Sequence, residues 1–195
     1  MVGAAQIAAG LAFALALSGA VRADDFRVEG NCRDGYAHGL YELRDMTGNV
    51  RVVGAFNRGK RTGSFLFWTA SGAREAQLPF DDDQLSGTAA LWWPALPQAE
   101  ARPRAEAAYA RGRHAGGVRT WYRNGKPAVE MYVGDGDLRI TRAASETGVA
   151  LSEAEARGVA AGELGYVDGR IAGLLALVDA NLPRCEPASN RLEKS

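Results

Sequence analysis

Residues 54–72, GAFNRGKRTGSFLFWTASG, place four glycines among closely spaced aromatic residues. Glycine and asparagine tolerate the left-handed backbone conformation that tight turns require. Aromatic and β-branched residues are enriched in strands, where they pack across neighbouring chains. The spacing therefore predicts short strands that are joined by tight turns.

The same pattern recurs in four units. Aligned on their first glycine, the units are 24, 24 and 29 residues apart and begin at Gly39, Gly63, Gly87 and Gly116. The sixth column of the alignment holds Arg44, Trp68, Trp92 and Trp121, and a later column holds Phe56, Phe80, Tyr109 and Val133. The longer third interval indicates an insertion within residues 94–108, which we expect to form an exposed loop or a short helix.

Each unit contains two β-prone runs and two turn signals. Asn124-Gly125 stands between apolar runs and is the strongest kind of short-range hairpin signal. The other turn reads NRGK, DDDQ, ARGR or GDGD in the four units. Units of this size cannot bury a face alone and must stack on their neighbours. The sequence thus predicts a mainly β fold, an antiparallel meander of about eight strands over residues 36–140 within a repeat domain of residues 24–140.

The last part of the chain, residues 141–195, has a helical pattern. Ser152 followed by Glu153 and Glu155 is typical of a helix start. Apolar residues then recur at three- and four-residue steps until Leu182-Pro183. We expect this helix to dock on the sheet, with a stripe of small residues for close packing at Gly165, Gly169 and Gly173. The alternative is a hairpin through Asp168-Gly169.

The amino-terminal residues and the two cysteines indicate export. Residues 1–23 combine a short apolar run with small residues near Ala23, a pattern typical of a signal peptide, and the alternative is a buried helix. In an oxidising compartment we expect Cys32 and Cys185 to form a disulfide; the alternative is two free or catalytic thiols. The predicted location is periplasmic or secreted. Charged residues interrupt the carboxyl-terminal helix, so we expect no membrane span after signal removal.

The amino-acid sequences of the units resemble those of a known family. GAFNRGKRTGSF and GGVRTWYRNGK are similar to the MORN repeat, and more closely to its bacterial variant in the YwqK-type antitoxin-like proteins. The resemblance covers about residues 36–138. It implies an elongated array of β-hairpins that serves in interactions, usually without catalysis.

The sequence offers little for catalysis, metal binding or cofactors. It lacks HExxH, GxSxG and CxxC patterns, and both His38 and His114 stand beside predicted turns. The acidic runs at residues 81–83 and 135–137 lack EF-hand spacing, so we interpret them as solvated turns rather than a Ca²⁺ site. Equal numbers of basic and acidic residues, 23 each, argue against a nucleic-acid partner. We therefore expect no enzyme, no cofactor and no metal.

The remaining candidates are aromatic. Trp93 and Tyr122 follow the tryptophan column by one residue, so they are predicted to lie on the opposite sheet face. If the helix covers the tryptophan column, Trp93 and Tyr122 remain open as a binding platform, and replacing both should cost little stability. The alternative is that these aromatics pack in the core. The leading hypothesis is a module that binds a protein partner, with an immunity or antitoxin-like role as one version. The alternative is a carbohydrate or cell-wall binding protein that uses these two aromatics.

Overall fold

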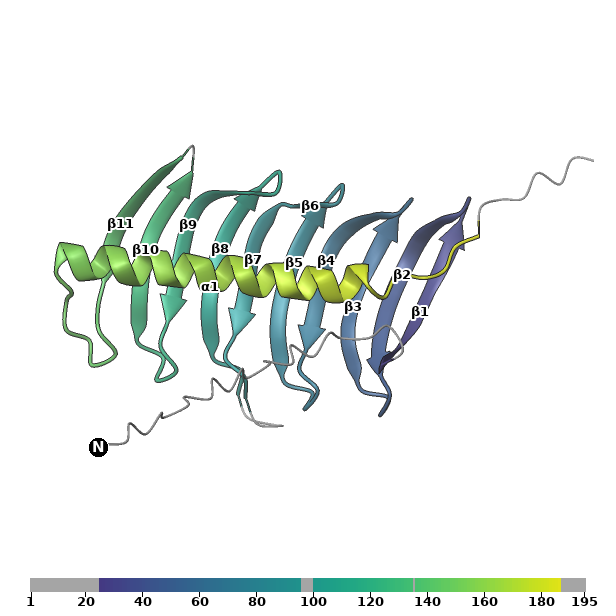
Figure 1. Ribbon diagram of the computed structural model, residues 1–195, viewed down its shortest axis with the longest axis horizontal. Helices are drawn as coiled ribbons and strands as arrows, with labels where there is room; N and C mark the ends of the chain where they lie inside the picture. The colour runs from purple at the N-terminus through teal and green to yellow at the C-terminus, as the bar shows by residue number, and fades with distance from the viewer. Residues whose placement is uncertain (1–24, 96–99, 135, 187–195) are drawn as a thin grey trace, which may run out of the picture.

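The computed structural model describes residues 25–95, 100–134 and 136–186. In these residues one open antiparallel sheet of eleven strands carries a single long helix across one face (Figure 1). The strands follow one another in chain order, except that the short β6 pairs only with β5. In sequence they are β1 (Phe26–Arg33), β2 (Tyr36–Asp45), β3 (Val50–Asn57), β4 (Lys60–Trp68), β5 (Arg74–Asp81), β6 (Gln84–Leu85), β7 (Gly87–Trp92), β8 (Pro103–Ala110), β9 (Arg113–Trp121), β10 (Pro127–Gly134) and β11 (Asp137–Ala143); the helix is α1 (Glu153–Asp179). The predicted meander with a docked carboxyl-terminal helix is confirmed.

The tight turns have the positive φ angles that their glycine and aspartate residues predict, and Arg58 and Arg111 adopt such angles as well. Asn57 pairs with Lys60, so Arg58 and Gly59 alone form the β3–β4 loop, with φ of 49° and 81°. Positive φ at both positions is the signature of the type I′ turn, whose twist matches that of the flanking strands. The same pair of positive φ angles occurs in the β5–β6 and β8–β9 turns.

The sheet extends beyond the predicted range at its amino-terminal side. Strand β1 was not predicted, although Asp34-Gly35 joins it to β2 with φ of 53° and 80° and is itself a strong hairpin signal. The insertion is also narrower than expected, because residues 103–108 belong to strand β8 rather than to a loop or helix. Alanines 105 and 107 face the core there, so packing overrides their helix propensity.

The core lies between the sheet and α1. The helix directs Ala156, Ala160, Val167, Ile171, Leu174 and Val178 at the sheet. Against them pack aromatic residues from successive strands: Tyr41, Phe56, Phe65 and Phe80, whose neighbouring rings stand 5.4 to 6.2 Å apart. Gly54 makes this packing possible, because a Cβ at that position would lie 2.5 Å from the ring of Phe65. In the opening stretch, glycine thus serves both as a turn residue and as space for an aromatic ring.

A β-bulge recurs at one column of the repeat. The strand register shifts opposite Arg44, Trp68, Trp92 and Trp121. The extra residue in each shift is Arg51, Glu75, Arg104 or Ala128. A bulge leaves one residue unpaired and turns its side chain away from the regular alternation. Glu75 forms an ion pair with Arg170 of α1, and Arg104 forms one with Glu163. Two of the four bulges therefore supply polar contacts between sheet and helix.

Helix α1 begins where the sequence predicts. Ser152 accepts a hydrogen bond from the Glu155 backbone N–H, and the Glu155 carboxylate accepts one from the Ser152 backbone N–H. This capping box satisfies two backbone donors that the helix itself cannot pair. Its hydrogen bonds hold the pKa of Glu155 below its usual value. The alternative hairpin at Asp168-Gly169 is wrong, because both residues lie inside α1.

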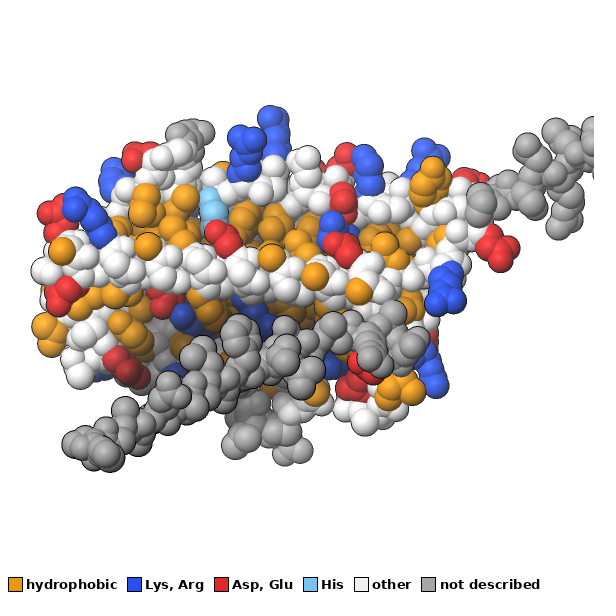
Figure 2. Space-filling view, viewed as in Figure 1, with side chains coloured by type: hydrophobic (Ala, Val, Ile, Leu, Met, Phe, Trp, Pro, Cys, Tyr) orange, Lys and Arg blue, Asp and Glu red, His pale blue; other side chains and the backbone are white. Residues whose placement is uncertain are grey.

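The glycines of α1 do not serve close packing, which corrects the sequence-based expectation. A Cβ added at Gly165, Gly169 or Gly173 would meet no atom of the described residues within 4 Å. These glycines are exposed, so the stripe faces away from the sheet. In Figure 2 hydrophobic side chains flank the helix on both sides, whereas its outer ridge is mostly backbone and small side chains.

Gly169→Ala is expected to raise the free energy of unfolding by about 0.5–1 kcal/mol, because alanine has the higher helix propensity and the methyl group has open space. Thermal or urea unfolding measures the change. Gly54→Ala is the matched control and should destabilise the fold, since its methyl group collides with Phe65. Destabilisation by Gly169→Ala would show that the outer ridge packs against something.

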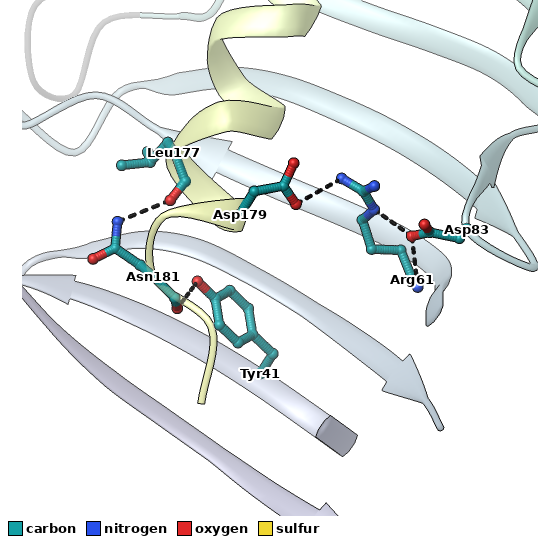
Figure 3. A network of polar contacts seen from close by, with 6 residues as sticks. All are labelled: Tyr41, Arg61, Asp83, Leu177, Asp179 and Asn181. Carbon is teal, nitrogen blue, oxygen red and sulfur yellow. Dashed lines mark hydrogen bonds and ion pairs between the residues drawn. The ribbon is translucent and has the colours of Figure 1, made fainter. Parts of the chain in front are cut away.

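The carboxyl-terminal end of α1 is fastened to the sheet (Figure 3). The Tyr41 hydroxyl donates a hydrogen bond of 2.9 Å to the backbone oxygen of Asn181. Burial, with a smaller contribution from Asp179, raises the pKa of Tyr41 above its usual range. Arg61 binds Asp83 at 2.6 Å and Asp179 at 3.3 Å, so it links β4 to the helix end.

The predicted disulfide is present between Cys32 of β1 and Cys185 beyond the helix. It joins residues 153 positions apart and closes most of the sheet and the whole helix into one loop. Such a bridge is typical of proteins that fold in an oxidising, extracytoplasmic environment. The predicted signal peptide, residues 1–23, lies outside the described residues.

Candidate interaction surface

The tryptophan column and the pair Trp93 and Tyr122 lie on opposite faces of the sheet. The helix covers the face that carries Trp93. Phe67, Leu91 and Thr120 are at most 2 % exposed and face α1. Trp68, Trp92 and Trp121, which we call the tryptophan row, follow them by one residue and therefore point to the other face. The helix thus does not cover the tryptophan column, which was the condition for Trp93 and Tyr122 to remain open. The physical reason is that the helix packs on the aromatic rings of the later column rather than on the indoles.

The face opposite α1, which we call the tryptophan face, has no covering layer in the described part of the chain (Figure 1). The tryptophan row runs along one side of it, with each indole half-buried. Arg74 is paired with Trp68 in the β4–β5 register, and its guanidinium lies 4.3 Å from the centre of the Trp92 ring. The centre of the face is mixed, because the half-buried Val53, Leu66 and Ala90 share one cross-strand row with polar side chains: Glu42, Gln77, Glu106, Arg119 and Glu130.

Trp93 belongs to a cluster that joins sheet and helix. Its ring lies 4.5 Å from the guanidinium carbon of Arg104, and its Nε1–H donates to the Trp121 backbone oxygen at 3.1 Å. Arg104 is 7 % exposed and binds Glu163 of α1 through two hydrogen bonds of 2.5 and 2.9 Å. The ring of Tyr166, also from α1, lies 4.4 Å from the same guanidinium. We call Trp93, Arg104, Glu163 and Tyr166 the arginine cluster.

Tyr122 lies beside this cluster. Its hydroxyl donates a hydrogen bond of 2.9 Å to the Ala144 backbone oxygen. Burial, with a smaller contribution from Glu163, raises its pKa above the usual value. The structure thus brings Trp93 and Tyr122 to the same side, where both are half-buried and both have internal partners. A binding role for Trp93 and Tyr122 stays a prediction. Because both side chains have internal partners, we expect that replacing both would destabilise the fold.

The arginine cluster was missed by sequence reasoning. The position of Arg104 in the bulge column carries a signal, since Arg51 and Glu75 occupy the same column and are also charged. A charged residue that recurs beside a tryptophan could have indicated a regular contact. The partner on α1 could not have been identified, because the helix has no repeat that matches the sheet.

His114 takes part in another contact between sheet and helix. Its Nε2 lies 2.8 Å from Oδ1 of Asp168 in α1 and 3.3 Å from the Tyr109 hydroxyl. Burial, followed by the nearby Asp168, raises the pKa of Tyr109 above its usual range. Asp168 is exposed, so the contact lies at the rim of the covered face.

The other polar candidates sit in turns. His38 accepts a weak hydrogen bond of 3.4 Å from the Arg58 backbone N–H. In the acidic run of residues 81–83, Asp82 binds Lys60 and Asp83 binds Arg61. In the second acidic run, Asp135 lies outside the described residues.

The described residues contain neither a metal-binding cluster nor a helix that could cross a membrane. Within residues 25–95, 100–134 and 136–186, no three His, Cys, Asp or Glu side chains gather in a way that could hold a metal ion. In the same ranges α1 falls short of the apolar length that a membrane-crossing helix requires.

No protein-family model matches this chain, and no curated protein sequence matches it significantly.

Proposed function

We propose that the protein is an exported, non-enzymatic interaction module that binds a protein partner through the tryptophan face. The observation that carries the proposal is the uncovered sheet face, on which three half-buried indoles lie in one row. Aromatic residues on flat, rigid surfaces are frequent anchors of protein interfaces. The resemblance of the units to MORN repeats supports the same class, and an immunity or antitoxin-like role is one form of it.

The second candidate is a carbohydrate or cell-wall ligand. Its support is the regular spacing of the tryptophan row, because every second strand places an equivalent ring at intervals of ~10 Å. Stacking of a sugar requires a free ring face, however, and Arg74 occupies a face of Trp92. Trp93, the other aromatic considered for this role, is occupied by Arg104 and also lies 5.2 Å from the Arg123 guanidinium. A protein partner therefore fits the surface better.

The disulfide supports a location outside the cytoplasm. Cys32 and Cys185 are paired, and both described cysteines are thereby accounted for. An oxidising compartment is the usual setting for such a bridge. We infer that the protein works in the periplasm or after secretion.

The test compares binding by the wild type with binding by the double variant Trp92→Ala/Trp121→Ala. Immobilised protein is exposed to extracytoplasmic extract, and a second arm measures sedimentation with peptidoglycan. We expect a specific protein partner to be retained by the wild type and reduced at least tenfold by the variant. Leu182→Ala is the control, since it removes an exposed apolar side chain that follows α1.

Circular dichroism must show that the variant remains folded. Undiminished capture of the partner by the folded variant would reject the tryptophan face as the binding surface. Sedimentation with peptidoglycan that depends on the tryptophan row would favour the carbohydrate candidate instead.

A further inference from the structure

Strand β11 forms one edge of the sheet. In the described residues its only long pairing is with β10, from Val129↔Ala143 to Gly134↔Asp137. An edge strand presents a row of unpaired backbone N–H and C=O groups that can pair with another chain. Most of β11 is exposed, as its burial shows. The edge is therefore accessible as well as unpaired.

After β11 the chain starts to form a further strand beside it, but this strand ends after a single bridge. The chain turns back through Ser145 and Val149, and Ala144 forms an isolated bridge with Ala150. The Leu151 N–H then donates to the Ala143 backbone oxygen at 3.1 Å. At Ser152 the chain leaves the sheet and starts α1. The segment after β11 thus pairs with it through one bridge only. Among the described residues, nothing pairs with the outer edge of β11 along residues 137–142.

A groove of about 520 Å³ lies beside this unpaired edge. Its walls are residues 138–143 of β11, Leu151 just before α1, and Glu153, Ala156 and Arg157 in the first turns of α1. The other edge of the sheet is different, because Pro183 packs against Gly30 and Cys185 is bonded to Cys32 of β1. The carboxyl-terminal tail thus lies against β1, whereas the groove beside β11 is open.

The two sides of β11 have different chemistry. Ile140 pairs with the buried Met131 and Leu138 pairs with Val133, so both point to the helix side of the sheet. On the tryptophan face, Arg142 pairs with Glu130 in the register and forms an exposed ion pair with its carboxylate at 3.8 Å. Arg139 lies over the Tyr132 ring at 6.0 Å and has no ion pair among the described residues. An added strand would thus meet Leu138, Ile140 and the Glu153–Arg157 ion pair of α1 on one side and two arginines on the other.

We propose that β11 takes up an extended segment of a partner protein as a twelfth strand, in which apolar residues toward α1 alternate with acidic residues toward Arg139 and Arg142. Backbone hydrogen bonds supply the affinity and the alternating side chains supply the specificity, as in other cases of strand addition. A second copy of this chain fits less well, because antiparallel pairing of two β11 strands brings four arginines onto one face, where like charges repel. The site is separate from the tryptophan row.

The test uses the whole disulfide-bonded protein and synthetic probes. The first probe is a labelled decapeptide of alternating glutamate and valine, measured by fluorescence anisotropy. The second replaces glutamate with lysine, and the third carries N-methyl groups on alternate residues, in two versions that block opposite edges. Amide hydrogen exchange with and without the first probe locates the bound strand.

We expect saturable binding of the glutamate peptide, at least tenfold weaker binding of one N-methylated version, and slower exchange in residues 137–143. Arg139→Glu/Arg142→Glu, both exposed positions, should weaken the glutamate peptide at least tenfold and favour the lysine peptide. Trp92→Ala/Trp121→Ala should bind the peptide like the wild type, so this proposal and the proposed function can fail separately.

Three results would overturn the proposal. The first is the absence of saturable binding to the wild type. The second is slower exchange confined to other segments, or equal binding of both N-methylated versions and the parent peptide. The third is a dimer in sedimentation equilibrium in which amide exchange of residues 137–143 is slower than in the monomer, which would identify a second copy as the occupant.

Discussion

Replacement of Cys32 and Cys185 together by serine is expected to lower the free energy of unfolding by about 4–5 kcal/mol. The bridge joins residues 153 positions apart, and the entropy that a cross-link removes from the unfolded chain grows with the length of the closed loop. It also holds the tail against β1, where Pro183 packs on Gly30. Loss of the bridge therefore acts on both the unfolded and the folded state.

Urea unfolding followed by circular dichroism measures this loss. Reduction of the wild type should reproduce most of the effect, since it removes the same cross-link without changing the sequence. If the double serine variant and the reduced wild type unfold at the same urea concentration as the oxidised protein, the bridge does not stabilise the fold.

Arg104→Ala is expected to cost about 3–5 kcal/mol, because it leaves the largely buried Glu163 carboxylate without its partner. The arginine also has the rings of Trp93 and Tyr166 at 4.5 and 4.4 Å, so packing is lost together with charge. The measurement is the free energy of unfolding in urea. Because the contact holds the middle of α1, amide exchange should also become faster in the helix.

Two further variants separate the causes. Arg157→Ala removes an exposed ion pair with Glu153 on the same helix and should cause no measurable loss. Arg104→Met/Glu163→Met replaces the buried pair by apolar side chains and should recover much of the stability. If Arg104→Ala is no more destabilising than Arg157→Ala, the arginine cluster does not fasten the helix.

The tight turns and the helix start could be predicted because their causes are local. Gly59 accommodates the positive φ that the β3–β4 turn requires, and Ser152 with Glu155 caps a helix from within four residues. Strand β1 was missed although its turn, Asp34-Gly35, carries the same local signal. The strand order was accessible too, since stacked hairpins with short turns can only follow one another in sequence.

The candidate site could be predicted only in part. Period-two alternation correctly separated Trp92 from Trp93, but it could not tell which face the helix would cover. Both faces carry aromatic residues, so hydrophobicity alone does not distinguish them. The unpaired edge of β11 could not be predicted from the sequence either, because it depends on the point at which the chain leaves the sheet for α1.

By itself, the sequence determined the repeat, the positions of its turns, the start of the helix and the pairing of the only two cysteines, because each depends on neighbouring residues or on residue counts. The tertiary structure decided that α1 packs on the Phe56, Phe65 and Phe80 side and leaves the tryptophan row open. It also turned the bulge residues Glu75 and Arg104 toward the helix. These outcomes depend on how two elements distant in sequence fit together, and that fit is settled by packing volume and by the pairing of buried charges.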